Sequence, residues 1–248
     1  MGEVILTASG NGGVGKTVIT ANLGGSIARE GASVILVDMN IGLRSLDICL
    51  GLENRIVYDL TDVITGTCRL KQALIRDRRF PELYLMSAPQ DRRKGTITQK
   101  EMGDLCRQLK ERYDYVLIDA PSGIGKGLEI CAGSADQAVI ITVPGYAALR
   151  DADLLNDALH QLGVNERSLV VNKIIADLYQ KGIVPDPVEI GEKLRLAVSG
   201  LVPFDLNIHV SSNIGVPIVL AKDSYIAGNF ARMAERLLSK KGERTLAV

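Results

Sequence analysis

The sequence contains no tryptophan and only three phenylalanines among its 248 residues. Aromatic side chains, on which single-stranded nucleic acids stack their bases, are therefore scarce. The 29 lysines and arginines equal the 29 aspartates and glutamates in number, so the formal net charge is zero. Because no overall positive field attracts nucleic acid, we expect no nucleic-acid partner.

The few cysteines and the lack of long apolar runs restrict the cellular setting. No Cys-x-x-Cys pair occurs, and no histidine stands at metal-ligand spacing from the four cysteines, which are Cys49, Cys68, Cys106 and Cys131. We predict reduced, packed thiols in a cytoplasmic protein. No apolar run approaches the roughly 18–20 residues of a membrane-spanning helix, and the N-terminus lacks the pattern of a signal peptide. Any membrane contact is therefore expected to be peripheral.

Short β-rich runs alternate with longer amphipathic stretches along the chain, as in strand–helix–strand units of a parallel sheet. The predicted strands are Val4–Ala8, Ser33–Val37, Leu83–Met86, Tyr115–Ile118, Ala138–Val143, Ser168–Asn172 and Leu201–Pro203. The predicted helices are Thr17–Glu30, Thr98–Arg112, Leu149–Leu162 and Ala227–Lys240. We predict an α/β fold of three layers, with a mostly parallel central sheet and helices on both faces. One domain is expected over residues 1–240, followed by a polar tail at 241–248.

Residues 10–17 read Gly-Asn-Gly-Gly-Val-Gly-Lys-Thr and satisfy the P-loop pattern G-x-x-x-x-G-K-[ST] between a predicted strand and a predicted helix. Such glycines let successive backbone N–H groups point at phosphate oxygens, and the helix start adds partial positive charge. Lys16 is suited to neutralise the β- and γ-phosphates, and the Thr17 hydroxyl to ligate Mg²⁺. The pattern predicts binding of ATP or ADP with Mg²⁺. The alternative, a glycine-rich turn that happens to contain a lysine, does not account for the flanking elements.

Two carboxylates follow predicted strands. Asp38 ends the second strand, and Asp119 ends the run Tyr115–Ile118. Ligands of parallel sheets bind at the carboxyl edge of the strands, so we expect both aspartates beside the P-loop as metal-linked residues. Asp119 is the better candidate, acting through water. A helix-capping or surface aspartate is the structural alternative for either.

With these residues identified, the chain resembles the ParA/MinD family of deviant Walker A P-loop ATPases, and most closely its MinD members. Besides the P-loop, the resemblance lies in Asp38–Asp47, Arg55–Asp59, Gln72–Asp77, Leu83–Leu85, Asp119–Ile124, Arg150–Asp153, Val171–Lys173 and Val202–Asp205. It covers most of the first 155 residues and thins afterwards. It implies a P-loop NTPase fold of the nitrogenase-iron-protein type.

The resemblance also implies a function. Members of this family bind ATP and pair face to face across two nucleotides in division-site placement. The expected partners are a second copy of the chain in an ATP-dependent homodimer, a MinC-like inhibitor and a MinE-like activator. The expected location is the cytoplasm, with a weak peripheral contact at the inner face of the cell membrane left open.

The same resemblance suggests the residues around the nucleotide. Asn172 is assigned to the base edge and Pro203 to the pocket wall, although an Asn at a strand end and a Pro in a turn are also common for local reasons. The residues expected to bind the nucleotide are Asn11, Gly12, Gly13, Val14, Gly15, Lys16, Thr17, Val18, Asn172 and Pro203.

Two positions depart from the family pattern in ways that affect catalysis. The family's signature lysine, which reaches the partner's phosphates, is Asn11 here, and its second switch aspartate is Asn40. An amide cannot supply the cationic charge that stabilises phosphoryl transfer, and it is a poor proton acceptor. The candidate catalytic set is Lys16, Asp38, Asn40 and Asp119. We therefore predict an ATPase that retains nucleotide binding but has weakened hydrolysis.

Other features carry alternatives. Residues 241–248 lack the basic–aromatic amphipathic pattern of a membrane-targeting helix and favour a frayed terminus over a weak anchor. The basic residues within 76–94 favour a solvated or partner-facing surface. His160 and His209 stand alone and are not predicted as catalytic bases. An iron–sulfur cluster between subunits would need a partner for Cys131 that the sequence does not offer.

Competing functions remain at this stage. The main hypothesis is a MinD-like ATPase that acts through ATP-dependent dimerisation. The alternatives are a degenerate nucleotide-binding scaffold without turnover, favoured by Asn11 and Asn40, or a related positioning ATPase for flagella or other polar assemblies.

Overall fold

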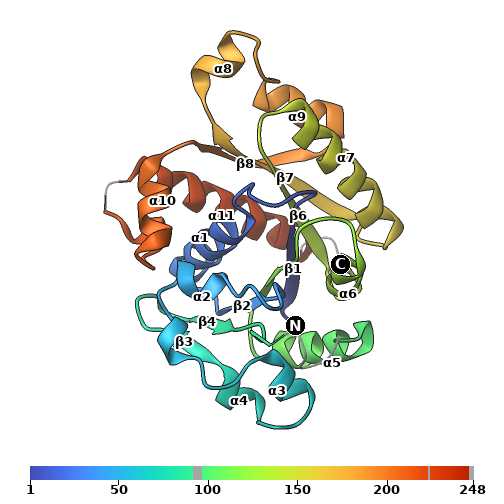
Figure 1. Cartoon of the computed structure of the whole chain (residues 1–248), viewed down its shortest axis with the longest axis vertical. Coiled ribbons are helices and arrows are strands. Elements are labelled where there is room, and N and C mark those ends of the chain that lie inside the picture. The colour runs from blue at the N-terminus through green and yellow to red at the C-terminus, as the bar shows by residue number, and fades with distance from the viewer. Residues whose placement is uncertain (92–96, 223, 246–248) are drawn as a thin grey trace.

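An eight-stranded sheet forms the middle of the computed structural model, which describes residues 1–91, 97–222 and 224–245, with side chains through residue 239 (Figure 1). The strand order is β3-β4-β2-β5-β1-β6-β7-β8. All neighbouring strands run parallel except β3, which pairs antiparallel with β4. The strands are β1 (Glu3–Ala8), β2 (Val34–Asp38), β3 (Ile75–Asp77), β4 (Leu83–Met86), β5 (Tyr115–Asp119), β6 (Gln137–Thr142), β7 (Glu166–Ile174) and β8 (Ala197–Pro203).

The central strands are apolar because both faces of the sheet are covered. Every residue of β2 and β5 is buried. In the register of these parallel strands, Asp38 pairs with Asp119, and Thr7 of β1 pairs with Asp119 on the other side. Both predicted carboxylates therefore lie at one edge of the sheet.

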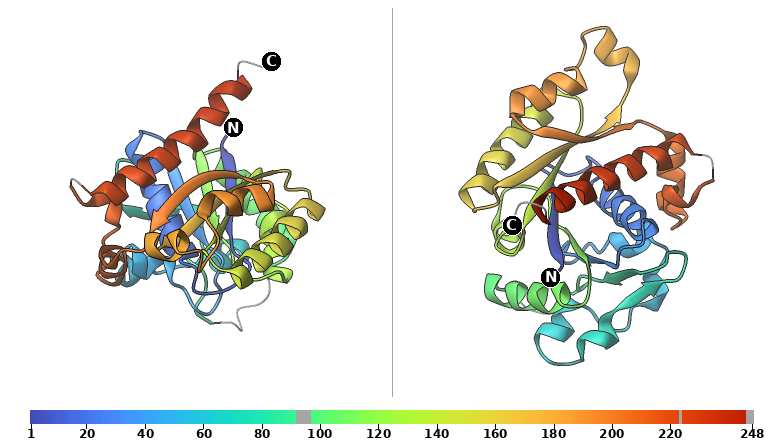
Figure 2. Two further views of the ribbon diagram at one scale, coloured as in Figure 1. Left: turned by 90° about the horizontal axis from the view of Figure 1, so that it is seen from above. Right: turned by 180° about the vertical axis from the view of Figure 1, so that it is seen from behind.

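Helices cover the sheet on both faces, as the two views of Figure 2 show. The α-helices are α1 (Lys16–Arg29), α2 (Leu46–Cys49), α3 (Leu60–Ile64), α4 (Leu70–Ala73), α5 (Gln99–Lys110), α6 (Lys126–Ala132), α7 (Tyr146–Gln161), α8 (Ala176–Gln180), α9 (Pro187–Leu194), α10 (Leu206–Asn213) and α11 (Tyr225–Thr245). The described residues also contain the 3₁₀ turns η1 (Glu53–Arg55) and η3 (Ile218–Leu220).

Two hydrophobic cores flank the sheet. On one face α1 and α11 pack together, with Leu23, Ile27 and Phe230 buried between them and the strands. On the other face α5, α6, α7 and α9 contribute a second buried cluster that includes Met102 and Leu155. Together the two cores hold the sheet rigidly, and so fix the carboxyl edge where the candidate site lies.

The predicted three-layer α/β fold is confirmed, and each predicted strand and helix occurs within a few residues of its expected bounds. The elements that the sequence patterns missed include β3, α9 and α10. The backbone of α11 continues to Thr245, so the terminal helix is longer than the predicted Ala227–Lys240. Residues 246–248 of the predicted tail, and residues 92–94 of the predicted basic segment, lie outside the described residues.

Candidate nucleotide-binding site

The P-loop connects β1 to α1, and its glycines hold conformations that other residues rarely adopt. Gly13 and Gly15 have φ angles of +79° and +90°, in the left-handed region. A Cβ atom on Gly15 would lie 2.4 Å from Nδ2 of Asn172, and one on Gly10 would lie 2.5 Å from the carbonyl oxygen of Asp151. The loop therefore needs glycine at Gly15 both for its backbone angle and for its close approach to β7.

Lys16 and Thr17 both contact the carboxylate that ends β5. Nζ of Lys16 lies 2.7 Å from Oδ1 of Asp119, and the hydroxyl of Thr17 donates to Oδ2 at 2.7 Å. The side chains of Lys16 and Asp119 are 7% and 0% exposed. A buried ion pair of this kind is stable only with further hydrogen bonds, which Thr17 provides.

The second carboxylate is held by a loop rather than by a cation. Oδ1 of Asp38 accepts hydrogen bonds from the backbone N–H of Asn40 at 2.8 Å and from its Nδ2 at 2.9 Å. Oδ2 accepts from the backbone N–H groups of Ser45 and Leu46 at 3.2 and 3.1 Å. Burial raises the pKa of Asp38 to about 6, and the nearby charge of Asp119 adds to the rise.

Asn40 joins the two carboxylates. Besides its bonds to Asp38, its Nδ2 donates to Oδ2 of Asp119 at 2.8 Å. The structure thus brings together Lys16, Thr17, Asp38, Asn40 and Asp119, all of which the sequence predicted at one site. An aspartate at position 40 would place a third carboxylate beside those of Asp38 and Asp119.

These oxygen atoms suit a magnesium ion. Mg²⁺ prefers hard oxygen donors and is usually held by one or two carboxylates, a hydroxyl, water and substrate phosphates. The Thr17 hydroxyl oxygen and Oδ2 of Asp119 lie 2.7 Å apart beside the P-loop, with Asp38 on the adjacent strand. The predicted metal-linked residues Thr17, Asp38 and Asp119 therefore fit the ion chemically.

A cavity of about 370 Å³ opens beside the P-loop, at the carboxyl ends of β7 and β8. Among its lining residues are four of the predicted nucleotide-binding residues: Gly15, Val18, Asn172 and Pro203. Nδ2 of Asn172 donates to the carbonyl oxygen of Val14 at 2.8 Å, which leaves Oδ1 of Asn172 as a hydrogen-bond acceptor. Such an acceptor can pair with a hydrogen-bond donor of a bound ligand.

Asn11 lies at the partly exposed start of the P-loop. Its carbonyl oxygen accepts a hydrogen bond from the hydroxyl of Ser9 at 3.0 Å. Within the described residues, no hydrogen bond fixes its side chain.

Several residues at the site were not singled out from the sequence. Thr20 is fully buried one turn after Lys16, and its hydroxyl lies 2.6 Å from that of Thr7 and 3.3 Å from Oδ1 of Asp119. Because Thr20 follows Lys16 by one turn of the predicted helix, its place on the same helix face could have been inferred from the sequence. His209 is an exposed surface residue, as expected, and it also lines the cavity of about 370 Å³ beside the P-loop, hereafter the base cavity.

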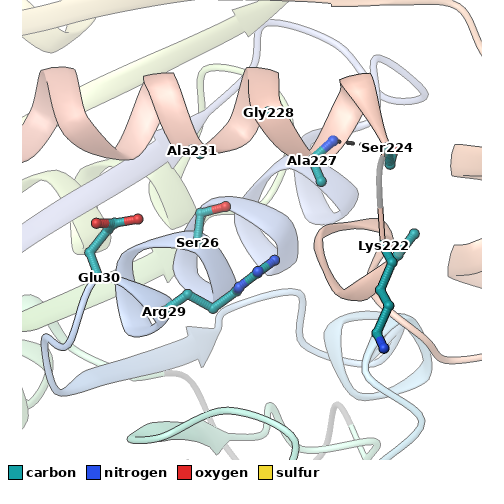
Figure 3. Close-up of a pocket in the computed structure, with 9 residues that line it drawn as sticks. Ser26, Arg29, Glu30, Lys222, Ser224, Ala227, Gly228 and Ala231 are labelled. Atoms are coloured by element: carbon teal, nitrogen blue, oxygen red, sulfur yellow. Dashed lines mark hydrogen bonds between the residues drawn. The ribbon is translucent and has the colours of Figure 1, made fainter.

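Other candidate features lie away from this site. A cavity of about 520 Å³ lies between the C-terminal part of α1 and the start of α11 (Figure 3). It is lined by Ser26, Arg29, Glu30 and Lys222 among others, and by none of the predicted site residues. Cys131 is completely buried, and burial raises the pKa of its thiol above the ordinary value. It therefore does not present a thiol at a surface where two subunits could share a cluster.

The strand–P-loop–helix unit, the paired carboxylates and the parallel sheet define a P-loop nucleoside triphosphatase. Residues 1–238 match the ParA family model, described as a NUBPL iron-transfer P-loop NTPase. The chain belongs to the ParA family, and the relatives that it resembles there are MinD proteins. The matched family consists of P-loop NTPases, whose substrates are nucleoside triphosphates.

Three comparisons support that assignment. The chain is 43% identical over 241 residues to a putative septum site-determining protein MinD of Chlorella vulgaris, covering 96% of this chain and 86% of that protein. It is 41% identical over 242 residues to the MinD of Bacillus subtilis, covering 97% and 90%. A solved MinC:MinD cell division protein complex of Aquifex aeolicus matches with a TM-score of 0.89 and 36% identity, covering 96% of each chain.

Proposed function

We propose that this chain is a MinD-like ATPase for division-site placement, whose ATP-bound form pairs with a second copy of the chain. The observation that carries this proposal is the similarity at 40–43% identity to septum site-determining proteins over most of the chain. The alternatives of a non-hydrolysing scaffold or a flagellar positioning ATPase have no comparable support.

In this proposal the residues of the site have distinct roles. Lys16 neutralises phosphate charge, and the P-loop N–H groups and the start of α1 bind phosphate oxygens. Thr17, Asp119 and Asp38 hold Mg²⁺, which when bound offsets charge on the β- and γ-phosphates. Asn172 accepts from the adenine amino group, and Pro203 forms a wall of the base pocket.

We further propose that hydrolysis is weak. The neutral side chain of Asn11 supplies no positive charge to stabilise the transferred phosphoryl group. In other P-loop NTPases, a cation supplied in trans accelerates this transfer by about 10³–10⁵-fold. Asn40 can orient water but is a poor proton acceptor. The groups that bind nucleotide and metal are retained, so binding is expected to remain tight while turnover falls.

The partners follow from the relatives. The solved Aquifex aeolicus complex contains MinC, which supports a MinC-like inhibitor as a partner of this chain. A MinE-like activator, and a weak contact of residues 241–248 with the inner face of the cell membrane, complete the proposal for a protein located in the cytoplasm. None of the helices in the described residues combines the length and the hydrophobicity that spanning a bilayer requires.

Light scattering and phosphate release test this proposal. Mg-ATP should convert the chain to a dimer while Mg-ADP leaves it monomeric, and a Lys16→Ala variant with native circular dichroism should neither bind nucleotide nor dimerise. Phosphate release is measured with and without anionic vesicles and a MinE-like activator. Absence of ATP-dependent pairing would refute the proposal, and stimulated turnover comparable to ordinary MinD proteins would refute weakened hydrolysis alone.

A further inference from the structure

Two adjacent side chains at the end of β7 reach two adjacent carbonyl groups of the P-loop. Asn172 donates to Val14 as described, and Nζ of Lys173 donates to the carbonyl oxygen of Gly13 at 2.6 Å. These contacts join positions 158 and 160 residues apart in the chain. Both bonds lie on carbonyl groups, so they leave the N–H groups of the loop available to phosphate.

The backbone of β7 is distorted at this point. Neighbouring residues of a regular strand point to opposite faces of the sheet, so Asn172 and Lys173 could not both face the P-loop from ideal strand geometry. Lys173 has a φ of +56°, in the left-handed region, and the register between β7 and β8 shifts between Val171 and Ile174. The distortion directs both side chains to the same loop.

A left-handed lysine is unfavourable because its Cβ crowds the backbone, and such strain persists where the surrounding structure enforces it. Here the strained residue makes a charge-assisted hydrogen bond, which is stronger than one between neutral groups. The ammonium group is attached to an exposed residue that also lines the base cavity. Its position is therefore at the outer side of the P-loop and not in the hydrophobic core.

We propose that Lys173 is a positioning residue that fastens the P-loop from outside, so that its N–H groups are arranged for phosphate before the nucleotide binds. The glycines give the loop conformational freedom, since glycine populates positive and negative φ about equally. The ammonium bond at Gly13, together with the Asn172 bond at Val14, restricts this freedom. Restricting a loop in its bound conformation raises affinity by lowering the entropy lost on binding.

The test compares Lys173→Met, which keeps the aliphatic stem, with Lys173→Arg, which keeps the charge. Amide hydrogen exchange of residues 10–15 is measured without nucleotide and with saturating Mg-ADP, and affinity is measured with a fluorescent ADP analogue. Lys173→Met should increase exchange and weaken affinity, each about tenfold, as expected for loss of one charge-assisted bond. Lys173→Arg should stay within about threefold of the unchanged protein.

Two further variants separate the ammonium group from other effects. Lys173→Gly removes the backbone strain as well, and should loosen the loop as much as Lys173→Met does. Lys181→Met removes an exposed lysine of the same charge after α8 and should change neither measurement. The exchange difference caused by Lys173→Met should disappear with saturating Mg-ADP, because the ligand then holds the loop itself.

Three results would overturn the proposed role of Lys173. Unchanged exchange in Lys173→Met would overturn the proposal even if affinity fell, because the lysine would then contact the nucleotide directly. An exchange difference that persists with saturating Mg-ADP, or that Lys181→Met reproduces, would also overturn it.

Discussion

The side-chain amide of Asn40 lies between two buried carboxylates, with its Nδ2 atom 2.9 Å from Oδ1 of Asp38 and 2.8 Å from Oδ2 of Asp119. One neutral NH₂ group thus donates to both charges. Without a carboxylate at position 40, the site avoids placing three acidic groups within hydrogen-bonding distance of one another. Asn40 therefore stabilises the arrangement that binds the metal, at the expense of the proton acceptor that an aspartate would supply.

Asn40→Asp should destabilise the protein measured in EDTA by about 2 kcal/mol, because a third buried carboxylate must either repel two others or take up a proton. Mg²⁺ with ADP should restore most of the loss, since a divalent cation neutralises the added charge. Thermal unfolding in EDTA and in Mg-ADP measures both effects. Asn54→Asp adds the same charge at an exposed position and should shift neither curve; equal shifts in the two variants would contradict the explanation.

The combined substitution Asn11→Lys with Asn40→Asp should raise ATP turnover at least about tenfold, since it restores a cation and a carboxylate near the reacting phosphate. Each single change should do less, because the two groups act on one transition state. The measurement is phosphate release at saturating Mg-ATP. Asn11→Gln with Asn40→Asp is the control that lengthens the side chain without adding charge. If turnover of the lysine-containing double variant stays flat, the assignment of weak hydrolysis to these two asparagines is wrong.

The raised pKa of Asp38, about 6 against an ordinary value of 3.8, predicts a pH-dependent stability. The folded protein binds this proton more tightly than the unfolded chain does, so the stability contributed by the protonated group is lost as pH rises from about 4 to about 6. Asp38→Asn removes this titration. In EDTA, the variant should gain about 2–3 kcal/mol relative to the unchanged protein over that interval. Urea unfolding at several pH values measures the difference, and parallel stability curves would argue against a raised pKa.

The site residues that could be predicted are those whose positions follow from the local pattern of strands and helices. The P-loop, Asp38 and Asp119 each end or follow a strand, so alternation of strands and helices was enough to place them at one edge. The contact of Lys173 with Gly13 depends on a distorted strand 160 residues away, which no local pattern encodes. Similarly, α10 mixes polar and apolar residues around its circumference, without the one-sided periodicity that reveals a surface helix, and β3 has only three residues.

Gly15→Ala should separate backbone strain from collision at the P-loop. A φ of +90° disfavours alanine by about 1 kcal/mol, and the new Cβ would lie 2.4 Å from Nδ2 of Asn172. Because relief of that collision must displace Asn172 from Val14, we expect about 2–4 kcal/mol of destabilisation and at least about a hundredfold loss of nucleotide affinity. Urea unfolding and titration with a fluorescent ADP analogue measure the two effects.

Gly31→Ala is the matched control, since Gly31 has a φ of +93° and no atom within 4 Å of the added Cβ. It should lose about 1 kcal/mol from backbone strain alone and retain full nucleotide affinity. Equal destabilisation of the two variants would mean that strain, and not the approach of β7 to the loop, requires glycine at position 15. A larger loss at Gly15 together with weakened binding would instead establish that the contact between Asn172 and the P-loop holds the nucleotide site in shape.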